Sequence, residues 1–290
     1  MSNDIVRLMA FSTLISTAAL ALHLDDPPFA IADCRYKLDD ESWGKQEYTN
    51  LHIPGAVYAH LGHDLAGPKT GTNGRHPLPD PKTLADTFGR LGIESGVQVV
   101  AYDQDNGMYA SRLWWLLRWL GHDAVAVLDG GFKKWIAEGR LTSSGTEHRA
   151  ATTFIGTPRA DMAIDAQAVG SLAGKPDWTL VDARAPERYR GETEPIDKTP
   201  GHIPGAVNYF FGWNLDDRGT FRTPEELRDK LGASIGAPVA ADHIVCYCGS
   251  GVTACHNLLA LEHAGLKGAR LYAGSWSEWS SDPARPVERG

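Results

Sequence analysis

The chain has 290 residues, of which 42% are hydrophobic and 22% charged, a composition that excludes a disordered protein and suffices for two ordinary cores. Its 28 basic and 36 acidic residues give a net charge of -8, which opposes sequence-independent attraction to nucleic acid or to an anionic membrane. A small-molecule substrate or a protein partner fits this balance better.

The first apolar segment, residues 14–24, is interrupted by Ser16, Thr17 and His23 and is too short to span a bilayer, so it predicts an amphipathic helix. The four cysteines show neither the spacing of a zinc site nor the even distribution of a disulfide framework. We therefore expect a cytoplasmic protein with one special thiol, with no metal and no membrane association.

The two halves of the chain repeat each other. The segment His-Ile-Pro-Gly-Ala occurs at 52–56 and again at 202–206, and Ala32-Asp-Cys-Arg35 matches Val181-Asp-Ala-Arg184. A third pair, 129–135 and 273–279, keeps nearly the same spacing. Self-similarity of this kind indicates a tandem of two copies of one structural unit.

Within each copy, valine-rich apolar runs alternate with helical patterns, which is typical of βαβ units around a parallel sheet covered on both faces. The predicted strands are, in chain order, 30–33, 97–102, 124–128, 179–182, 243–247 and 269–272. Asp80-Pro81 and the capping box from Thr223 to Glu226 each predict the start of a helix. The expected fold is therefore α/β, with two domains that each contain a parallel sheet flanked by helices.

Residues 141–160 are rich in Thr, Ser, Gly and Ala without a period, which is typical of a connection between domains. The expected boundaries are 1–140 for the first domain, 141–160 for the linker and 161–290 for the second domain.

The clearest chemical signal is Cys248-Gly-Ser-Gly-Val-Thr253, which follows the predicted strand 243–247 and precedes a predicted helix over 254–264. In a strand, tight loop and helix, backbone N–H groups and the positive end of the helix dipole converge on one atom. The glycines allow the backbone to curl around that atom. A cysteine at this point has its thiolate favoured over its thiol and becomes a nucleophile.

Such a loop also occurs in cysteine phosphatases, where an arginine six positions after the cysteine clamps phosphate. Here that position is Ala254, so the phosphatase reading loses its main anion ligand. Cys246 and Cys255 lie outside the loop and are expected to be small buried hydrophobic residues.

These features identify a resemblance to the tandem-domain rhodanese superfamily over nearly the whole chain. Shared with that family are both His-Ile-Pro-Gly-Ala segments, Asp182-Ala-Arg184, Arg188-Tyr-Arg-Gly191, Glu194-Pro195 and Gly274-Ser-Trp-Ser-Glu-Trp279. The loop at 248–254 resembles that of the 3-mercaptopyruvate sulfurtransferase branch, whereas the thiosulfate-using branch typically has Arg-Lys in place of Gly249-Ser250.

The resemblance implies a sulfurtransferase in which Cys248 carries sulfur as a persulfide and needs no cofactor. It also implies that the loop binds substrate through Gly249, Gly251, Val252 and Thr253. The alignment of the two copies places Asp103 where Cys248 lies. A carboxylate cannot carry a sulfane sulfur, so we expect the first copy to be catalytically silent.

The resemblance assigns Arg188 to the carboxylate or sulfonate of the substrate, for which a planar guanidinium is a suitable partner. The second arginine that the family usually places downstream is missing, and Arg184 or Lys198 is the candidate replacement.

By the same resemblance, Ser250 and His76 act together on the substrate or move a proton. The aspartate of the family's third position is replaced by His60, with Asp64 four residues later. His60 and Asp64 are therefore the candidates for the third member.

The expected reaction transfers sulfur from 3-mercaptopyruvate to a thiol, which is either a small molecule or a thioredoxin-like protein, or to cyanide. Two alternatives stay open at this point. One is thiosulfate as the donor to the same Cys248, and the other is a noncatalytic module that relays a persulfide made elsewhere.

Overall fold

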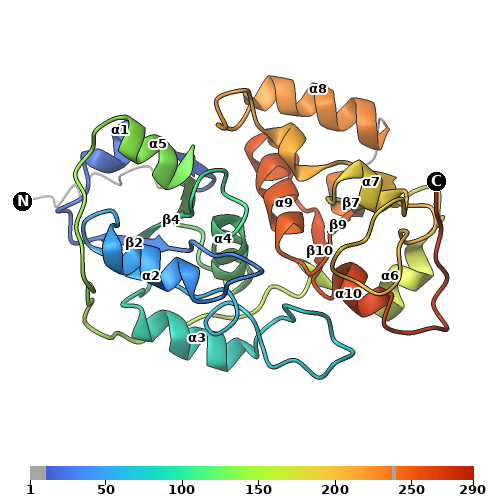
Figure 1. Ribbon diagram of the computed structural model, residues 1–290, viewed down its shortest axis with the longest axis horizontal. Helices are drawn as coiled ribbons and strands as arrows, with labels where there is room; N and C mark the ends of the chain where they lie inside the picture. Colours follow the sequence, from blue (N-terminus) through green and yellow to red (C-terminus); the bar gives the residue numbers. More distant parts are fainter. Residues whose placement is uncertain (1–10, 237–239) are drawn as a thin grey trace, which may run out of the picture.

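Two five-stranded parallel sheets organise the computed structural model, which describes residues 11–236 and 240–290 (Figure 1). In order across the first sheet, the strands are β1 (Leu14–Ile15), β5 (Val125–Leu128), β4 (Gln98–Tyr102), β2 (Phe29–Asp33) and β3 (Ala56–Tyr58). Those of the second sheet are β6 (Ala163–Ile164), β10 (Arg270–Tyr272), β9 (Ile244–Tyr247), β7 (Thr179–Asp182) and β8 (Val207–Asn208). The two orders are equivalent strand by strand, which confirms the predicted fold class.

Helices cover both faces of each sheet. In the first domain they are α1 (Thr17–Ala21), α2 (Trp43–Asn50), α3 (Pro81–Arg90), α4 (Ala110–Trp119) and α5 (Gly131–Ala137). In the second domain they are α6 (Ala166–Leu172), α7 (Pro186–Tyr189), α8 (Pro224–Ile235), α9 (Thr253–His263) and α10 (Ser275–Trp279), with short 3-10 helices at Phe211–Asn214 and Ala241–His243.

Alternate residues of a strand point to opposite faces, and this decides which helices each face receives. In β2, Phe29 and Ile31 pack in one cluster with α1 and α5, whereas Ala30 and Ala32 pack in another with α3 and α4. All five residues of β2 are buried, as expected for a strand of a sheet covered on both sides.

The six predicted strands are confirmed, with ends that differ by at most one residue. The predicted helix over 14–24 is wrong in part, because Leu14 and Ile15 pair with β5 and only Thr17–Ala21 is helical. The hydroxyl of Ser16 accepts a hydrogen bond from the N–H of Ala19 and so caps this short helix.

Helix starts follow the predicted signals. The carboxylate of Asp80 accepts hydrogen bonds from two backbone N–H groups of α3, and the capping box between Thr223 and Glu226 is present at the start of α8. Residues 141–160 lie along the first domain, where Thr152 donates to Gly89 and Thr157 donates to Leu120 through their backbone N–H groups.

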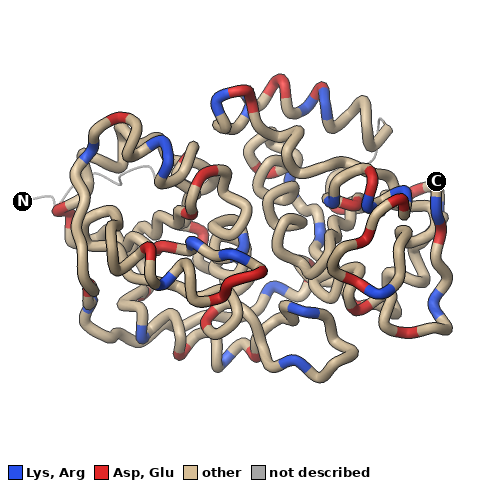
Figure 2. Tube along the Cα trace, in the orientation of Figure 1, with Lys and Arg blue, Asp and Glu red and all other residues tan. Residues whose placement is uncertain are grey.

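The domains meet where α4 and α9 pack against each other, and one cluster of buried apolar residues continues from the first domain into the second. Acidic and basic residues are interspersed over both domains (Figure 2). Among the helices of the described residues, none has both the length and the apolar character needed to cross a bilayer.

Candidate active site

Cys248 lies directly after β9, and the loop that it opens leads into α9 at Thr253. The start of α10 holds this loop from behind. The N–H of Trp276 donates to the carbonyl oxygen of Cys248 at 2.9 Å, and the N–H of Ser277 donates to that of Gly249 at 2.9 Å. Gly251 has φ +75°, and a Cβ at this position would lie 2.4 Å from the carbonyl oxygen of Ala273. The loop conformation therefore requires glycine at 251.

Ser275 supports the cysteine through an unusual backbone conformation. Its φ of 54° is in the left-handed region, where a residue with a Cβ is disfavoured. The hydroxyl of Ser275 accepts a hydrogen bond from the N–H of Cys248 at 3.1 Å and donates to the carbonyl of Tyr272 at 2.9 Å. The equivalent residue of the first copy is Gly131, with φ +57°. In the second copy, a serine with a strained backbone conformation therefore binds the backbone N–H of Cys248.

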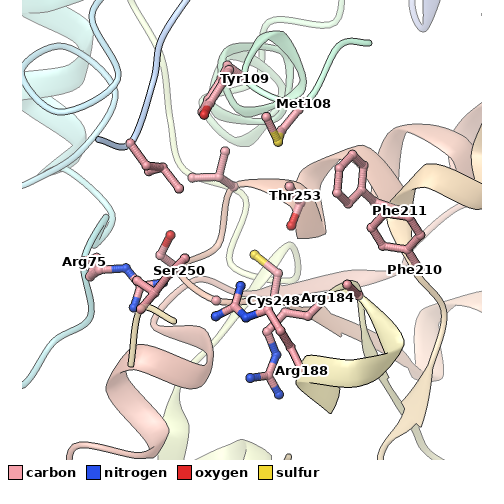
Figure 3. A pocket seen from close by; sticks show the side chains of 15 residues that line it. Arg75, Met108, Tyr109, Arg184, Arg188, Phe210, Phe211, Cys248, Ser250 and Thr253 are labelled. Carbon is pink, nitrogen blue, oxygen red and sulfur yellow. The ribbon is translucent and has the colours of Figure 1, made fainter. Parts of the chain in front are cut away.

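Cys248 lies at a cavity of about 190 Å³ between the two domains. The cavity is lined by Met108, Tyr109, Arg75 and Leu38 from the first domain, and by Arg184, Ala185, Arg188, Ile196, Phe210, Phe211, Cys248, Gly249, Ser250, Val252 and Thr253 from the second. Figure 3 shows the sulfur of Cys248 in the middle of these side chains. The loop residues that sequence reasoning assigned to substrate binding therefore border the cavity, except for Gly251, which shapes the loop.

The other three cysteines are closed off from solvent. Cys34, Cys246 and Cys255 each have 0% of their surface exposed. Burial raises the pKa of all three thiols, that of Cys255 to about 12. They therefore stay protonated, and Cys248 is the one cysteine that borders the cavity.

His76 and Ser250 approach each other across the domain interface, with 2.8 Å between His76 Nδ1 and Ser250 Oγ. Burial lowers the pKa of His76 to about 3, and the nearby positive charge of Arg112 acts in the same direction. The imidazole is therefore neutral at physiological pH and can donate through one nitrogen and accept through the other.

Arg112 of α4 is fully buried and holds the two segments together. Its guanidinium donates to the carbonyl oxygen of Gly251 at 3.0 Å and to that of His76 at 3.1 Å. A buried guanidinium without these acceptors would be very costly, so Arg112 fixes the position of His76 relative to the cysteine loop. Sequence reasoning missed this residue, because it appears in a helix pattern as one polar position among leucines and tryptophans.

The structure does not bring His60 or Asp64 to His76. The Asp64 carboxylate accepts hydrogen bonds from Arg90 and from the N–H of His60, both at 2.8 Å. The ring of His60 accepts from the N–H of Gly62 through Nδ1 and lies 3.2 Å from the carbonyl of Glu41 through Nε2. The hydrogen-bond partners of both side chains therefore lie in the first domain and do not include His76.

Two arginines of the second domain reach the cavity in different ways. Arg188 is paired with Glu194 at 2.6 Å and lies 3.5 Å from Asp197. Arg184 donates to Asp182, Glu194 and the carbonyl of Gly201. Arg35 of the first copy binds Asp33 and Leu51 in the same manner. The pairing of Arg184 with Asp182 is therefore a feature of the fold, and most N–H groups of Arg184 already have partners in the protein.

The third arginine of the cavity is Arg75, which comes from the first domain. Its guanidinium pairs with Asp197, and its Nη2 lies 2.8 Å from the position that a Cβ on Gly249 would occupy. Sequence reasoning searched for a second arginine downstream of Arg188 and missed Arg75, although it is adjacent to His76.

The loop of the first copy that corresponds to the Cys248 loop holds the carboxylate of Asp103. The carboxylate of Asp103, fully buried, accepts hydrogen bonds from the N–H groups of Asp105, Gly107, Tyr109 and Ala110, at 2.7 to 3.2 Å. The loop after the equivalent strand thus concentrates donors on the atoms at its first position. Burial raises the pKa of Asp103, and these N–H donors act in the opposite direction.

The residues that the structure describes were also compared with the requirements of a metal-binding site. Among the described residues, no group of three or more His, Cys, Asp or Glu side chains lies close enough to hold a metal ion.

Comparison with known proteins gives a consistent result. The family described as Rhodanese-like domain matches residues 16–138 and 165–282. A protein of Pseudomonas aeruginosa named "Probable 3-mercaptopyruvate sulfurtransferase" is 47% identical over 97% of this chain and 100% of its own. The thiosulfate sulfurtransferase of Cricetulus griseus is 34% identical over 98% of both chains. The crystal structure of SseA from Escherichia coli, whose description concerns 3-mercaptopyruvate sulfotransferases, superposes with a TM-score of 0.79 at 31% identity, over 92% of this chain and 99% of that one.

Proposed function

Because this chain belongs to the rhodanese-like domain family, we propose that it is a sulfurtransferase that moves sulfane sulfur from 3-mercaptopyruvate to a thiol or to cyanide through a persulfide on Cys248. The observation that carries the proposal is the cavity between the domains. It brings the sulfur of Cys248, the guanidiniums of Arg75 and Arg188, and a serine bonded to a neutral histidine within reach of one small anion.

In the first half-reaction, the Cys248 thiolate attacks the sulfur of mercaptopyruvate. The S–S bond forms as the carbon–sulfur bond breaks, and its electron pair stays on carbon as the enolate of pyruvate. The proton of the substrate thiol remains on the terminal sulfur of the persulfide, and the enolate takes up a proton to become pyruvate. Loop N–H groups stabilise the persulfide, as the equivalent loop stabilises Asp103.

His76 and Ser250 act on the developing enolate. With His76 donating through Nδ1, the Ser250 hydroxyl is free to donate to the substrate oxygen that gains charge. Arg188 and Arg75 anchor the carboxylate of the substrate. In the second half-reaction, a thiolate or cyanide attacks the outer sulfur and releases Cys248 as a thiolate, which gives ping-pong kinetics.

The acceptor must enter the cavity, since only 2% of the Cys248 surface is exposed. A small thiol, cyanide or a protruding cysteine of a thioredoxin-like protein meets this condition. The proposal places the reaction in the cytoplasm, because a free thiolate requires a reducing compartment. In this scheme the first copy forms no persulfide of its own, but it supplies His76, Arg75 and one wall of the cavity.

Thiosulfate is the second candidate donor, favoured by the presence of two guanidiniums beside Cys248. The test supplies the purified chain with mercaptopyruvate and a small thiol, and in parallel with thiosulfate and cyanide. Pyruvate, sulfide and thiocyanate are measured, with Cys248→Ser as the control. Turnover of mercaptopyruvate supports the proposal, and turnover of thiosulfate alone favours thiosulfate as the donor. If neither donor is turned over, the remaining interpretation is a noncatalytic module that relays a persulfide made elsewhere.

A further inference from the structure

A row of alternating charges lies beside the cavity, which its three arginines line. Its members are, in order of contact, Asp182, Arg184, Glu194, Arg188, Asp197 and Arg75. Three cations and three anions alternate, so the cluster carries no net charge before a substrate enters. Within this row of charges, Asp197 is the carboxylate that contacts both of the guanidiniums beside Cys248, those of Arg75 and Arg188.

Those two guanidiniums come from different domains and meet at the cysteine loop. A Cβ built on Gly249 would lie 2.8 Å from Arg75 Nη2 and 3.7 Å from both terminal nitrogens of Arg188. Asp197 pairs with Arg75 through Oδ1 and lies 3.5 Å from Arg188 through Oδ2. It is 8% exposed, so water screens its charge weakly.

The hydrogen bonding of this trio is incomplete. Asp197 Oδ2, Arg75 Nε and Arg188 Nε are buried and have no hydrogen-bond partner among the residues that the structure describes. Terminal nitrogens of both guanidiniums lie near Gly249, where they can meet an anionic ligand, while the negative charge of Asp197 opposes that ligand.

We propose that Asp197 determines the donor specificity of this site by keeping its net charge at zero, so that a substrate with one negative charge is accepted more readily than one with two. This inference rests on the proposed function. The repulsion from Asp197 acts on each charge of the ligand, so thiosulfate, a dianion, is penalised about twice as much as the single carboxylate of mercaptopyruvate. Removing the charge of Asp197 should therefore improve the use of thiosulfate more than the use of mercaptopyruvate.

The test compares the parent with Asp197→Asn, which keeps the shape and removes the charge. Values of kcat/KM for thiosulfate and mercaptopyruvate are measured at fixed acceptor, pH and ionic strength. We expect the ratio of thiosulfate to mercaptopyruvate to rise by roughly tenfold. Asp197→Glu, which retains the charge, should keep the parental ratio. The matched control Glu192→Gln removes one charge from an exposed pair with Arg190 and should also leave the ratio unchanged.

A second measurement does not depend on sulfur transfer. Sulfate and acetate, as dianionic and monoanionic probes, are titrated against each full-length variant, and their stabilisation of the fold is followed as a shift in Tm. Asp197→Asn should bind sulfate more tightly relative to acetate. An unchanged sulfate-to-acetate preference, or equal losses for both donors in the Asn and Glu variants, would overturn the role of Asp197. Failure of the parent to transfer sulfur from either donor would contradict the proposed function alone, because the probe titration still reports the charge of the site.

Discussion

His76 and Ser250 are hydrogen-bonded at 2.8 Å although they are 174 residues apart and belong to different domains. The bond exists because the buried guanidinium of Arg112 holds the carbonyl of His76 and that of Gly251 at once. The position of the histidine therefore depends on how the two domains pack, and a site assembled in this way loses activity when either half is moved.

His76→Ala should lower kcat more than it raises KM, because the neutral imidazole acts on charge that develops in the transition state. Positioned proton transfer contributes about 10²- to 10⁴-fold, and we expect a loss within that range. Steady-state kinetics with mercaptopyruvate measure it, with His63→Ala on the exposed part of a neighbouring loop as the control. A change confined to KM would reduce His76 to a binding residue.

Replacement of Asp103 should destabilise the protein more than it slows the reaction. Asp103 is a buried carboxylate that accepts four backbone hydrogen bonds. Each buried N–H left without a partner costs about 1–3 kcal/mol, so we expect the free energy of unfolding to fall by at least about 2 kcal/mol.

The rate of the Asp103→Ala variant, measured well below its Tm, should stay within roughly tenfold of the parent, because Asp103 does not touch the substrate. Denaturant unfolding and steady-state kinetics on the same preparation separate the two effects. Unchanged stability together with a rate loss of a hundredfold or more would assign Asp103 itself a part in the chemistry.

Ser275 offers a direct test of backbone strain beside the cysteine. Ser275→Gly relieves the cost of a positive φ and loses the hydrogen bond from the Cys248 N–H, whereas Ser275→Ala keeps the strain and loses the same bond. We expect Ala to be the more destabilising of the two by about 1 kcal/mol. Chemical denaturation measures the difference. Equal stability of the two variants would show that the conformation carries no strain.

Stability should fall on mild acidification. Burial lowers the pKa of His76 to about 3 and that of His256 to about 4, below the value of about 6.5 that both have in the unfolded chain. As the pH falls below about 6.5, the unfolded chain takes up protons that the native protein cannot bind. Each histidine then removes up to about 1.4 kcal/mol per pH unit, until the pH reaches its native pKa.

Denaturant unfolding between pH 7 and about pH 4 measures this slope. His256→Gln should make the slope shallower, since a glutamine does not titrate. A slope that is identical in the parent and in His256→Gln would contradict the assignment.

Much of this organisation was predictable from the sequence, because the repeated segments and the Cys248 loop are local patterns. The two-domain α/β fold and six of the strands were found in this way. The short strands β1, β3, β6 and β8 were missed, because two or three residues show no period and their pairing partners are distant in sequence. Arg75 and Asp197 were not recognised as partners for the same reason, since their contact depends on the packing of the two domains.

The most direct test of the account is the mass of the intact protein after brief treatment with mercaptopyruvate in the absence of an acceptor, followed by peptide mapping. The account predicts one added sulfur atom per chain, located on Cys248, absent from Cys248→Ser and present in Cys34→Ser, Cys246→Ser and Cys255→Ser. Added sulfur located mainly on another cysteine, or none on Cys248 from either mercaptopyruvate or thiosulfate, would contradict it.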